Sequence, residues 1–343
     1  MLYRTYRPTT FSEVVGQEHV VRTLQGALAS GRIGHAYLFA GPRGTGKTTI
    51  ARIFAKAAMG LKADGDPGMD LVEIDAASNR GIDDVRQLKE TAAVSPAMMP
   101  YKVFIIDEVH MLSKDAFNAL LKLLEEPPAH ALFVLATTEP HKVLPTVLSR
   151  VQRFDFRKLT QAQITTKLQH IAKAEKLDAE PEALATMAAA ADGAMRDAEV
   201  MLTKLVSHAD GVRITTASVQ SVLGLVPQNW YDRFVRLVSG KNRAAALREL
   251  GDVAQNGADM EHVSRGLVEF LRQVMLAKID PGILASAGLA DVRTAAVASL
   301  AGELDGAWLV RAITSFTNAR SQLRSSVIPT LPLELAVIEL AVG

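Results

Sequence analysis

Short runs of apolar residues, each followed by turn or acidic residues, mark the first part of the chain. In chain order these runs are Ala36–Ala40, Leu71–Ile74, Val103–Ile106 and Leu132–Ala136. Continuous apolar runs of this length are typical of strands covered on both faces. Helical patterns such as Lys47–Met59 and Ala116–Leu124 lie between them. The alternation of strand and helix predicts a parallel sheet with helices on both faces.

The pattern changes after Leu159. Residues 160–224 carry Ala, Leu, Lys and Gln at helical spacing without a convincing strand. The remainder is again helical, with breaks near Asp280–Gly282 and Ile328–Pro329. The fold class we expect is therefore α/β plus all-α, in three domains: an α/β domain at residues 1–159, a small helical domain at 160–225 and a second helical domain at 226–343.

The amino-acid composition excludes several kinds of site chemistry. The 343 residues include no cysteine, which excludes disulfides, a thiol nucleophile and a thiolate zinc site, and which is compatible with a cytoplasmic protein. The apolar runs are far shorter than a membrane span, so we expect no membrane partner. Lys and Arg total 38 against 37 for Asp and Glu, yet residues 1–60 hold eight basic and two acidic residues. An anionic ligand is expected in the α/β domain.

The segment Gly41–Thr48 reads Gly-Pro-Arg-Gly-Thr-Gly-Lys-Thr and fits the phosphate-binding pattern G-x-x-x-x-G-K-[ST]. It follows an apolar strand and opens a helix, as this loop requires, because backbone N–H groups and the helix dipole then point at the phosphates. Lys47 is expected to contact the β and γ phosphates, and Thr48 to offer its hydroxyl to Mg²⁺. The candidate nucleotide-binding residues here are Gly41, Gly44, Thr45, Gly46, Lys47, Thr48 and Thr49.

Polar residues end two of the predicted strands. Asp107 and Glu108 follow Val103–Ile106, and Thr137–Thr138 closes the run at Leu132. An acidic pair or a Thr pair at a strand end is also common on plain solvated surface. Downstream of a phosphate-binding loop, we expect Asp107 to hold Mg²⁺ through water and Glu108 to act as general base. Because ligands gather at the carboxyl ends of parallel strands, we expect Thr138 to sense the γ-phosphate.

A series of motifs resembles one family. They are Tyr6–Pro8 with Phe11, Val14–Gln17, His35–Phe39, the phosphate-binding loop, Asp107–Leu112, Asn118–Lys122, Leu124–Pro128 and Ala136–Thr138. Together they resemble the gamma/tau subunits of bacterial DNA polymerase III, which are AAA+ clamp loader ATPases. Beyond residue 154 the match thins, but Gly193–Asp197 is similar to the sensor 2 segment and Leu331–Leu335 to the last collar helix.

The resemblance implies an ATP-hydrolysing motor that opens a sliding clamp and loads it on primed DNA, within a cytoplasmic, nucleoid-associated replisome. It implies an AAA+ domain, a helical lid and a collar that assembles a pentamer with delta and delta-prime type subunits and copies of the chain itself. Arg150 would be the arginine finger acting in trans, and Arg196 would sense the γ-phosphate in its own subunit. Arg7, Pro8, Val14 and Val15 would complete the nucleotide site.

A contact with primer-template DNA is expected at Asn79, Arg80 and Gly81. Ser78–Asp83 has the pattern of a helix start capped by Asn or Ser, and it resembles the clamp loader segment whose helix N-terminus follows the phosphates of duplex DNA. Asp83 and the following Asp84 would repel DNA, so a plain capped helix is the competing interpretation. Lys114 is a further candidate.

The chain departs from the resembled family at two positions. The interval Gly60–Asp70 lacks the usual four-cysteine zinc module, and Val151 follows Arg150 where the family has cysteine, so we expect ATP and Mg²⁺ but no zinc. A long tau tail is also not expected in a chain that ends on the collar.

Three other kinds of protein share some of these motifs. A non-hydrolysing structural subunit would carry a damaged loop or acidic pair, and both are intact. A helicase of the D-E-x-H type would need a second α/β domain. A branch-migration AAA+ motor would end in a winged DNA-binding domain rather than a collar.

Overall fold

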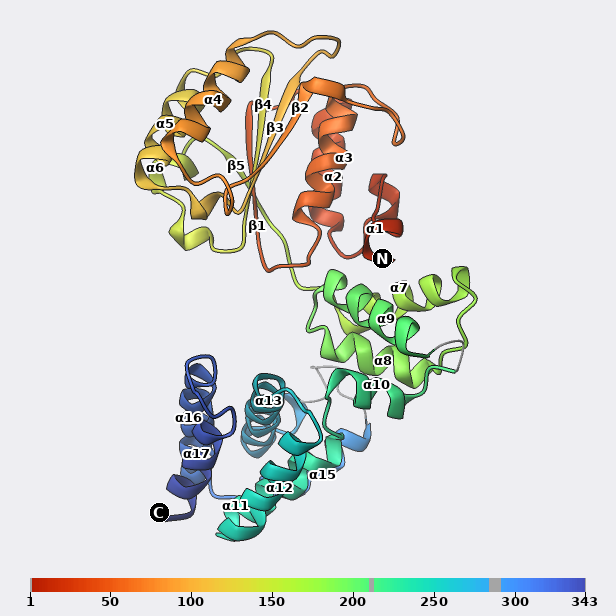
Figure 1. The fold of residues 1–343 in the computed structure, drawn as a ribbon, viewed down its shortest axis with the longest axis vertical. Coiled ribbons are helices and arrows are strands. Elements are labelled where there is room, and N and C mark those ends of the chain that lie inside the picture. The colour runs from red at the N-terminus through yellow and green to blue at the C-terminus, as the bar shows by residue number, and fades with distance from the viewer. Residues whose placement is uncertain (1, 210–212, 284–290, 343) are drawn as a thin grey trace. The chain divides into compact units, whose positions relative to one another are not determined.

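The computed structural model describes residues 2–209, 213–283 and 291–342, and the chain forms two compact units, Met1–Thr215 and Thr216–Gly343. The first unit is built on a five-stranded parallel sheet in the order β2-β3-β4-β1-β5 (Figure 1). Its strands are β1 (Ala36–Ala40), β2 (Leu71–Asp75), β3 (Lys102–Asp107), β4 (Ala131–Thr137) and β5 (Gln152–Asp155). The predicted α/β plus all-α fold class is confirmed, and four strands match the predicted apolar runs.

The fifth strand was not predicted from the sequence. β5 pairs only with β1, at the edge of the sheet, and only Phe154 of its four residues is buried. A short edge strand with three exposed polar residues has no apolar run to reveal it.

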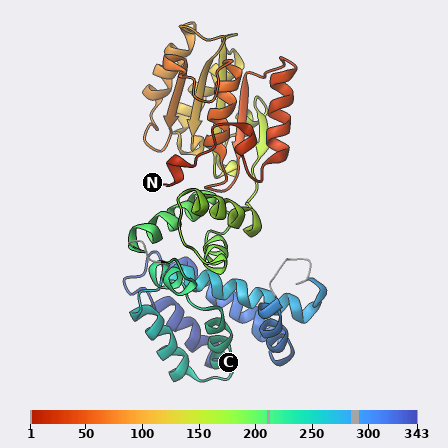
Figure 2. The same ribbon diagram turned by 90° about the vertical axis from the view of Figure 1, so that its right-hand side faces the viewer.

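Helices cover both faces of the sheet (Figure 1, and turned by 90° in Figure 2). α2 (Glu18–Ala29) and α3 (Lys47–Ala58) pack on one face, where Phe54 meets Val103 and Ile105 in a single apolar cluster. α4 (Ile82–Ala93), α5 (Lys114–Glu125) and α6 (Pro145–Leu148) pack on the other, with Phe104 and Ile106. Alternate residues of β3 therefore point into two cores, which explains its unbroken apolar sequence.

A three-helix lid completes the first unit. It consists of α7 (Gln161–Ala174), α8 (Pro181–Ala190) and α9 (Met195–Ala209). The lid is tied to the loop after β1, because the backbone N–H of Met195 donates to the carbonyl of Gly44 at 3.1 Å. The short N-terminal helix α1 (Leu2–Thr5) lies along α9, and the N–H of Leu2 donates to the hydroxyl of Thr203 at 3.4 Å. The lid and the phosphate-binding loop are thus parts of one compact unit.

The second unit is helical throughout its described residues. Its helices are α10 (Thr216–Leu223), α11 (Gln228–Ser239), α12 (Arg243–Gln255), α13 (Met260–Ile279), α15 (Asp291–Glu303), α16 (Gly306–Gln322) and α17 (Leu331–Val342). α13 ends immediately before the predicted break at Asp280, and the second predicted break separates α16 from α17. Among the described residues, no helix is both long and apolar enough to cross a membrane. The three-domain division stays a prediction.

Candidate active site

The loop Gly41–Gly46 joins β1 to α3 at the carboxyl edge of the sheet. Gly41 has φ +152°, and a Cβ there would lie 2.5 Å from the carbonyl oxygen of Phe156, so no larger residue fits. Gly46, with φ +98°, is the N-cap of α3, whose first residue is Lys47. The sequence folds into this open loop because its glycines accept positive φ, which leaves the N–H groups at the start of α3 available to an anion.

Lys47 is turned back onto its own loop. Its Nζ donates to the carbonyls of Gly41 at 2.8 Å and Pro42 at 2.9 Å. The residue is 6% exposed, and burial lowers the pKa of Lys47, against the opposing charges of Glu108 and Asp107. A phosphate would replace these neutral carbonyl acceptors with negatively charged oxygens, to which an ammonium group bonds more strongly.

Thr48 and Asp107 come together from α3 and β3. The hydroxyl of Thr48 donates to Oδ2 of Asp107 at 2.7 Å, and the other carboxylate oxygen, Oδ1, accepts the N–H of Glu108 at 2.9 Å. A hydroxyl and a carboxylate in contact are the hard oxygen donors that Mg²⁺ binds directly or through water. These two residues therefore fit the predicted ion.

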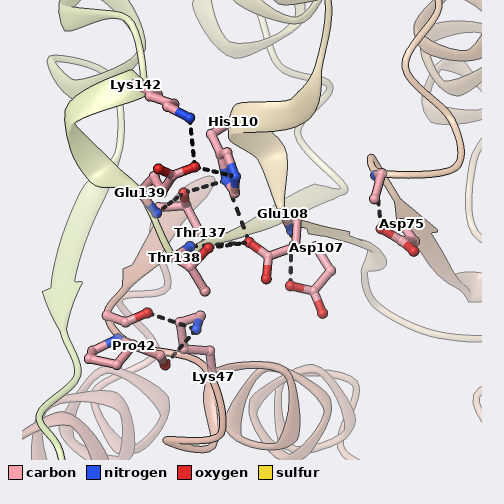
Figure 3. Close-up of polar contacts among 12 residues, drawn as sticks. Pro42, Lys47, Asp75, Asp107, Glu108, His110, Thr137, Thr138, Glu139 and Lys142 are labelled. Atoms are coloured by element: carbon pink, nitrogen blue, oxygen red, sulfur yellow. Dashed lines mark hydrogen bonds and ion pairs between the residues drawn. The ribbon is translucent and has the colours of Figure 1, made fainter. Parts of the chain in front are cut away.

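Glu108 lies at the end of β3, facing the end of β4. Its Oε2 accepts hydrogen bonds from the hydroxyl of Thr138 at 2.9 Å and from the N–H of Thr138 at 3.2 Å (Figure 3). The predicted γ-phosphate sensor thus contacts the predicted general base. Its role as a sensor stays a prediction.

Lys47, Thr48, Asp107 and Glu108 line a pocket of about 180 Å³ that is open to solvent. All predicted nucleotide-binding residues line it except Gly41, which instead accepts from Lys47. Sequence reasoning missed Tyr3, Glu13, Arg43, Ile50, Leu159, Lys167, Met195 and Glu199, which line it as well. For Glu199 a signal existed: it lies among Met195, Ala198 and Leu202 at helical spacing, on the face that the lid buries.

The lid brings Arg196 and Glu199 to this pocket from the first turns of α9. The Arg196 guanidinium lies 5.2 Å from the ring centroid of Tyr3, a cation–π contact that α1 provides. Glu199 is 6% exposed, and burial raises the pKa of its carboxyl to about 7, against the opposing charge of Lys167 on α7.

Arg150 follows α6 and is not among the pocket residues. Its guanidinium donates to Oε1 of Glu125 at 2.7 Å and to the carbonyl of Thr146 at 2.7 Å. Glu125 and Arg150 border a separate, open depression beside His35 and Gln152. Arg150 is therefore outside the nucleotide site of its own chain.

The candidate DNA-binding residues adjoin one another. The N–H of Ser113, which precedes Lys114, donates to the carbonyl of Arg80 at 3.1 Å. The expected Asn or Ser cap of α4 is wrong: Gly81 is the N-cap, and the side chain of Asn79 donates to the carbonyl of Asp75 instead. Asp84 takes the capping role, since its carboxylate accepts the N–H of Gly81 at 2.9 Å.

Models of three protein families match consecutive segments of the chain. "DNA polymerase III, delta subunit" matches residues 16–160, "DNA polymerase III clamp loader subunit, ATPase lid domain" matches 163–211, and "DNA polymerase III subunits gamma and tau domain III" matches 214–342. The chain is 43% identical to DNA polymerase III subunit tau of Bacillus subtilis over 82% of its own length and 53% of that protein. It is 35% identical to subunit gamma/tau of Mycobacterium bovis over 99% of its length and 62% of the relative. The chain thus spans between half and two thirds of the length of these relatives.

A solved structure shares the fold. The Thermotoga maritima RuvB Holliday junction branch migration motor aligns with a TM-score of 0.53, covering 72% of this chain and 85% of that one at 21% identity. At that identity the likeness extends to the fold alone.

Proposed function

The chain belongs to the gamma/tau family of DNA polymerase III subunits, and we propose that it is an ATP-hydrolysing motor subunit of a bacterial clamp loader. The observation that carries this proposal is the contact of Thr48 with Asp107 at 2.7 Å beside the loop of Lys47, with Glu108 at the same edge of the sheet. These are the groups needed to bind a nucleoside triphosphate and to activate water.

In this mechanism the loop N–H groups and Lys47 bind the phosphates, and Thr48 with Asp107 would hold Mg²⁺, which when bound neutralises phosphate charge. Glu108 takes the proton from the attacking water. Its Oε2 is engaged by Thr138, while Oε1 accepts no hydrogen bond from the described residues and can receive that proton. Arg196 approaches the phosphates from the lid, and Arg150 supplies the guanidinium to the neighbouring subunit's site.

We further propose that the substrate assembly is a sliding clamp with primer-template DNA, in the cytoplasmic replisome. The partners are delta and delta-prime type subunits and copies of the chain itself. Leu331, Leu335 and Ile338 support assembly through the second unit, since they are 38%, 55% and 41% exposed along one side of α17. A winged domain, as the branch-migration alternative requires, has no counterpart in residues 216–283 and 291–342, which contain no strand.

The test is the rate of ATP hydrolysis by the purified chain assembled with delta and delta-prime type subunits, with and without sliding clamp and primed DNA. Clamp and DNA together should stimulate the rate. The Glu108→Gln variant should bind a fluorescent ATP analogue normally. It should hydrolyse ATP about 10²- to 10⁴-fold more slowly, which is the usual contribution of a general base. A wild-type rate indifferent to clamp and DNA would overturn the clamp-loader proposal.

A further inference from the structure

A histidine lies directly behind Glu108. His110 belongs to η3 (Val109–Met111), the short 3-10 helix after β3, and its side chain is only 5% exposed. Its Nδ1 is 3.0 Å from the hydroxyl of Thr137 and 3.4 Å from Oε2 of Glu108, and its Nε2 is 3.1 Å from Oε2 of Glu139 (Figure 3). The ring thus stands between Glu108 and the segment that follows β4.

The partners of the ring fix its orientation. A carboxylate only accepts hydrogen bonds, so Nε2 carries a hydrogen and donates it to Glu139. On the other side, Thr137 is fully buried, and its hydroxyl oxygen accepts the N–H of Glu139 at 3.0 Å while contacting Nδ1. With a partner on each nitrogen, the imidazole has one orientation, and in it the Nδ1 edge of the ring lies 3.4 Å from Oε2 of Glu108. In the neutral ring Nδ1 accepts from Thr137, so the ring restrains Glu108 by packing against its carboxylate rather than by donating to it.

Glu139 is itself restrained. Lys142 donates to its Oε2 at 2.8 Å, and this hydrogen bond lowers the pKa of Glu139. A carboxylate that stays ionised keeps accepting from His110 through the neutral pH range. The contacts therefore run without a gap from Lys142 through Glu139 and His110 to Glu108.

Glu108 needs such support because its backbone is strained. It has φ 48° and ψ 44°, in the left-handed region, which is unfavourable for a residue with a side chain. Among the described residues, the contacts of its carboxylate fall on Oε2, from Thr138 on one side and His110 on the other. Thr138 bonds Oε2, and the His110 ring limits its movement on the other side, which leaves Oε1 for water.

We propose that His110 is a positioning residue for ATP hydrolysis, which holds the carboxylate of Glu108 between itself and Thr138 and is held in turn by Thr137 and Glu139. This inference rests on the proposed function, because it takes Glu108 as the base. His110 does not touch the phosphates or the water. Its loss should therefore slow the chemical step without weakening nucleotide binding.

The test compares three substitutions of His110 in the assembled clamp loader. His110→Leu removes both polar contacts, His110→Asn keeps a polar atom at the place of Nδ1, and His110→Gln keeps one at the place of Nε2. The matched control is His141→Gln, since His141 also faces Glu139, at 4.0 Å, but is 72% exposed. For each we would measure kcat, KM and the Kd of a fluorescent ATP analogue.

We expect His110→Leu to lower kcat about 10- to 100-fold, as losses of orienting groups around an active site do. KM and Kd should stay within twofold of wild type, His110→Asn should recover most of kcat, and the control should match wild type. The inference is overturned if kcat of His110→Leu stays within twofold, or if His110→Asn is no better than His110→Gln. The comparison of His110→Asn with His110→Gln tests the positioning role even if His110→Leu does not fold. Failure of the proposed function would be seen in the wild-type protein alone, as a rate indifferent to clamp and DNA.

Discussion

Replacing Glu199 by glutamine should change how the stability of the first unit depends on pH. The pKa of this carboxyl is about 7 in the fold against an ordinary 4.5, because burial disfavours its charge. Since the folded pKa is raised, no stability is lost below pH 4.5. Between pH 4.5 and 7 the unfolded chain ionises while the folded one does not, so stability falls as pH rises. At about 1.4 kcal/mol per tenfold change in acidity constant, the loss above pH 7 is on the order of 3 kcal/mol.

Glu199→Gln removes that loss. We therefore compare the free energy of unfolding of the variant with that of wild type at each pH. The difference should be larger at pH 8 than at pH 4.5 by up to about 3 kcal/mol, or roughly 6 to 12 °C in Tm for a unit of this size. Both tryptophans, Trp230 and Trp308, belong to the second unit, so their fluorescence would not follow the lid. Calorimetry of the nucleotide-free chain, with hydrogen exchange of α9 to assign the transition, is the suitable assay.

The matched control is Glu182→Gln, an exposed glutamate on α8, which should leave the pH dependence of Tm unchanged. Lys167→Gln should increase the loss of stability as pH rises, because the Lys167 charge partly offsets the cost of ionising Glu199 in the fold. If the difference in Tm between Glu199→Gln and wild type is the same at pH 4.5 and pH 8, the buried-carboxyl explanation is wrong.

Two further predictions concern the arginines. Arg150→Ala should leave the Kd of a fluorescent ATP analogue within twofold and lower assembly-dependent hydrolysis by about 10³ to 10⁵, the usual contribution of an arginine finger; loss of nucleotide binding instead would place Arg150 in its own site. Tyr3→Leu removes the ring under Arg196, a contact worth about 0.5 to 1 kcal/mol, and should lower kcat/KM roughly two- to fivefold, whereas Tyr3→Phe, which keeps the ring, should not.

The parts of the fold that the sequence reveals are those with a dense local signal. The strand before Gly41 and the one before Asp107 are buried on both faces, so their apolar runs are unbroken. The loop before Lys47 has a glycine-rich composition that few other structures require. β5 could not be predicted from the sequence because Phe154 is the only buried residue of this strand. Its place in the sheet depends on pairing with β1, which is a distant segment of the chain.

The surroundings of the site depend even more on distant segments. Nothing in the neighbours of His110 along the chain indicates that Thr137 and Glu139 will face its two nitrogens, since these residues meet only when β3 and β4 pair. The cap of α4 shows the opposite error. Ser78 and Asn79 have the composition of a cap, but the carbonyl of Asp75 competes for the Asn79 side chain, and the helix begins three residues later, at Ile82.

The stretch from Thr138 to Arg150 has a consequence for genetic experiments. One end of it bonds to Glu108, and the other end carries the guanidinium of Arg150, which we propose acts in the neighbouring subunit's site. On that proposal, a substitution in this stretch can damage two active sites at once, and an assembly made only of mutant subunits gives one rate for both defects. Assemblies that mix wild-type and variant subunits separate the two defects. Loss of the Arg150 guanidinium lowers hydrolysis in the neighbouring subunit, whereas loss of the Thr138 contact lowers it in the mutated subunit itself.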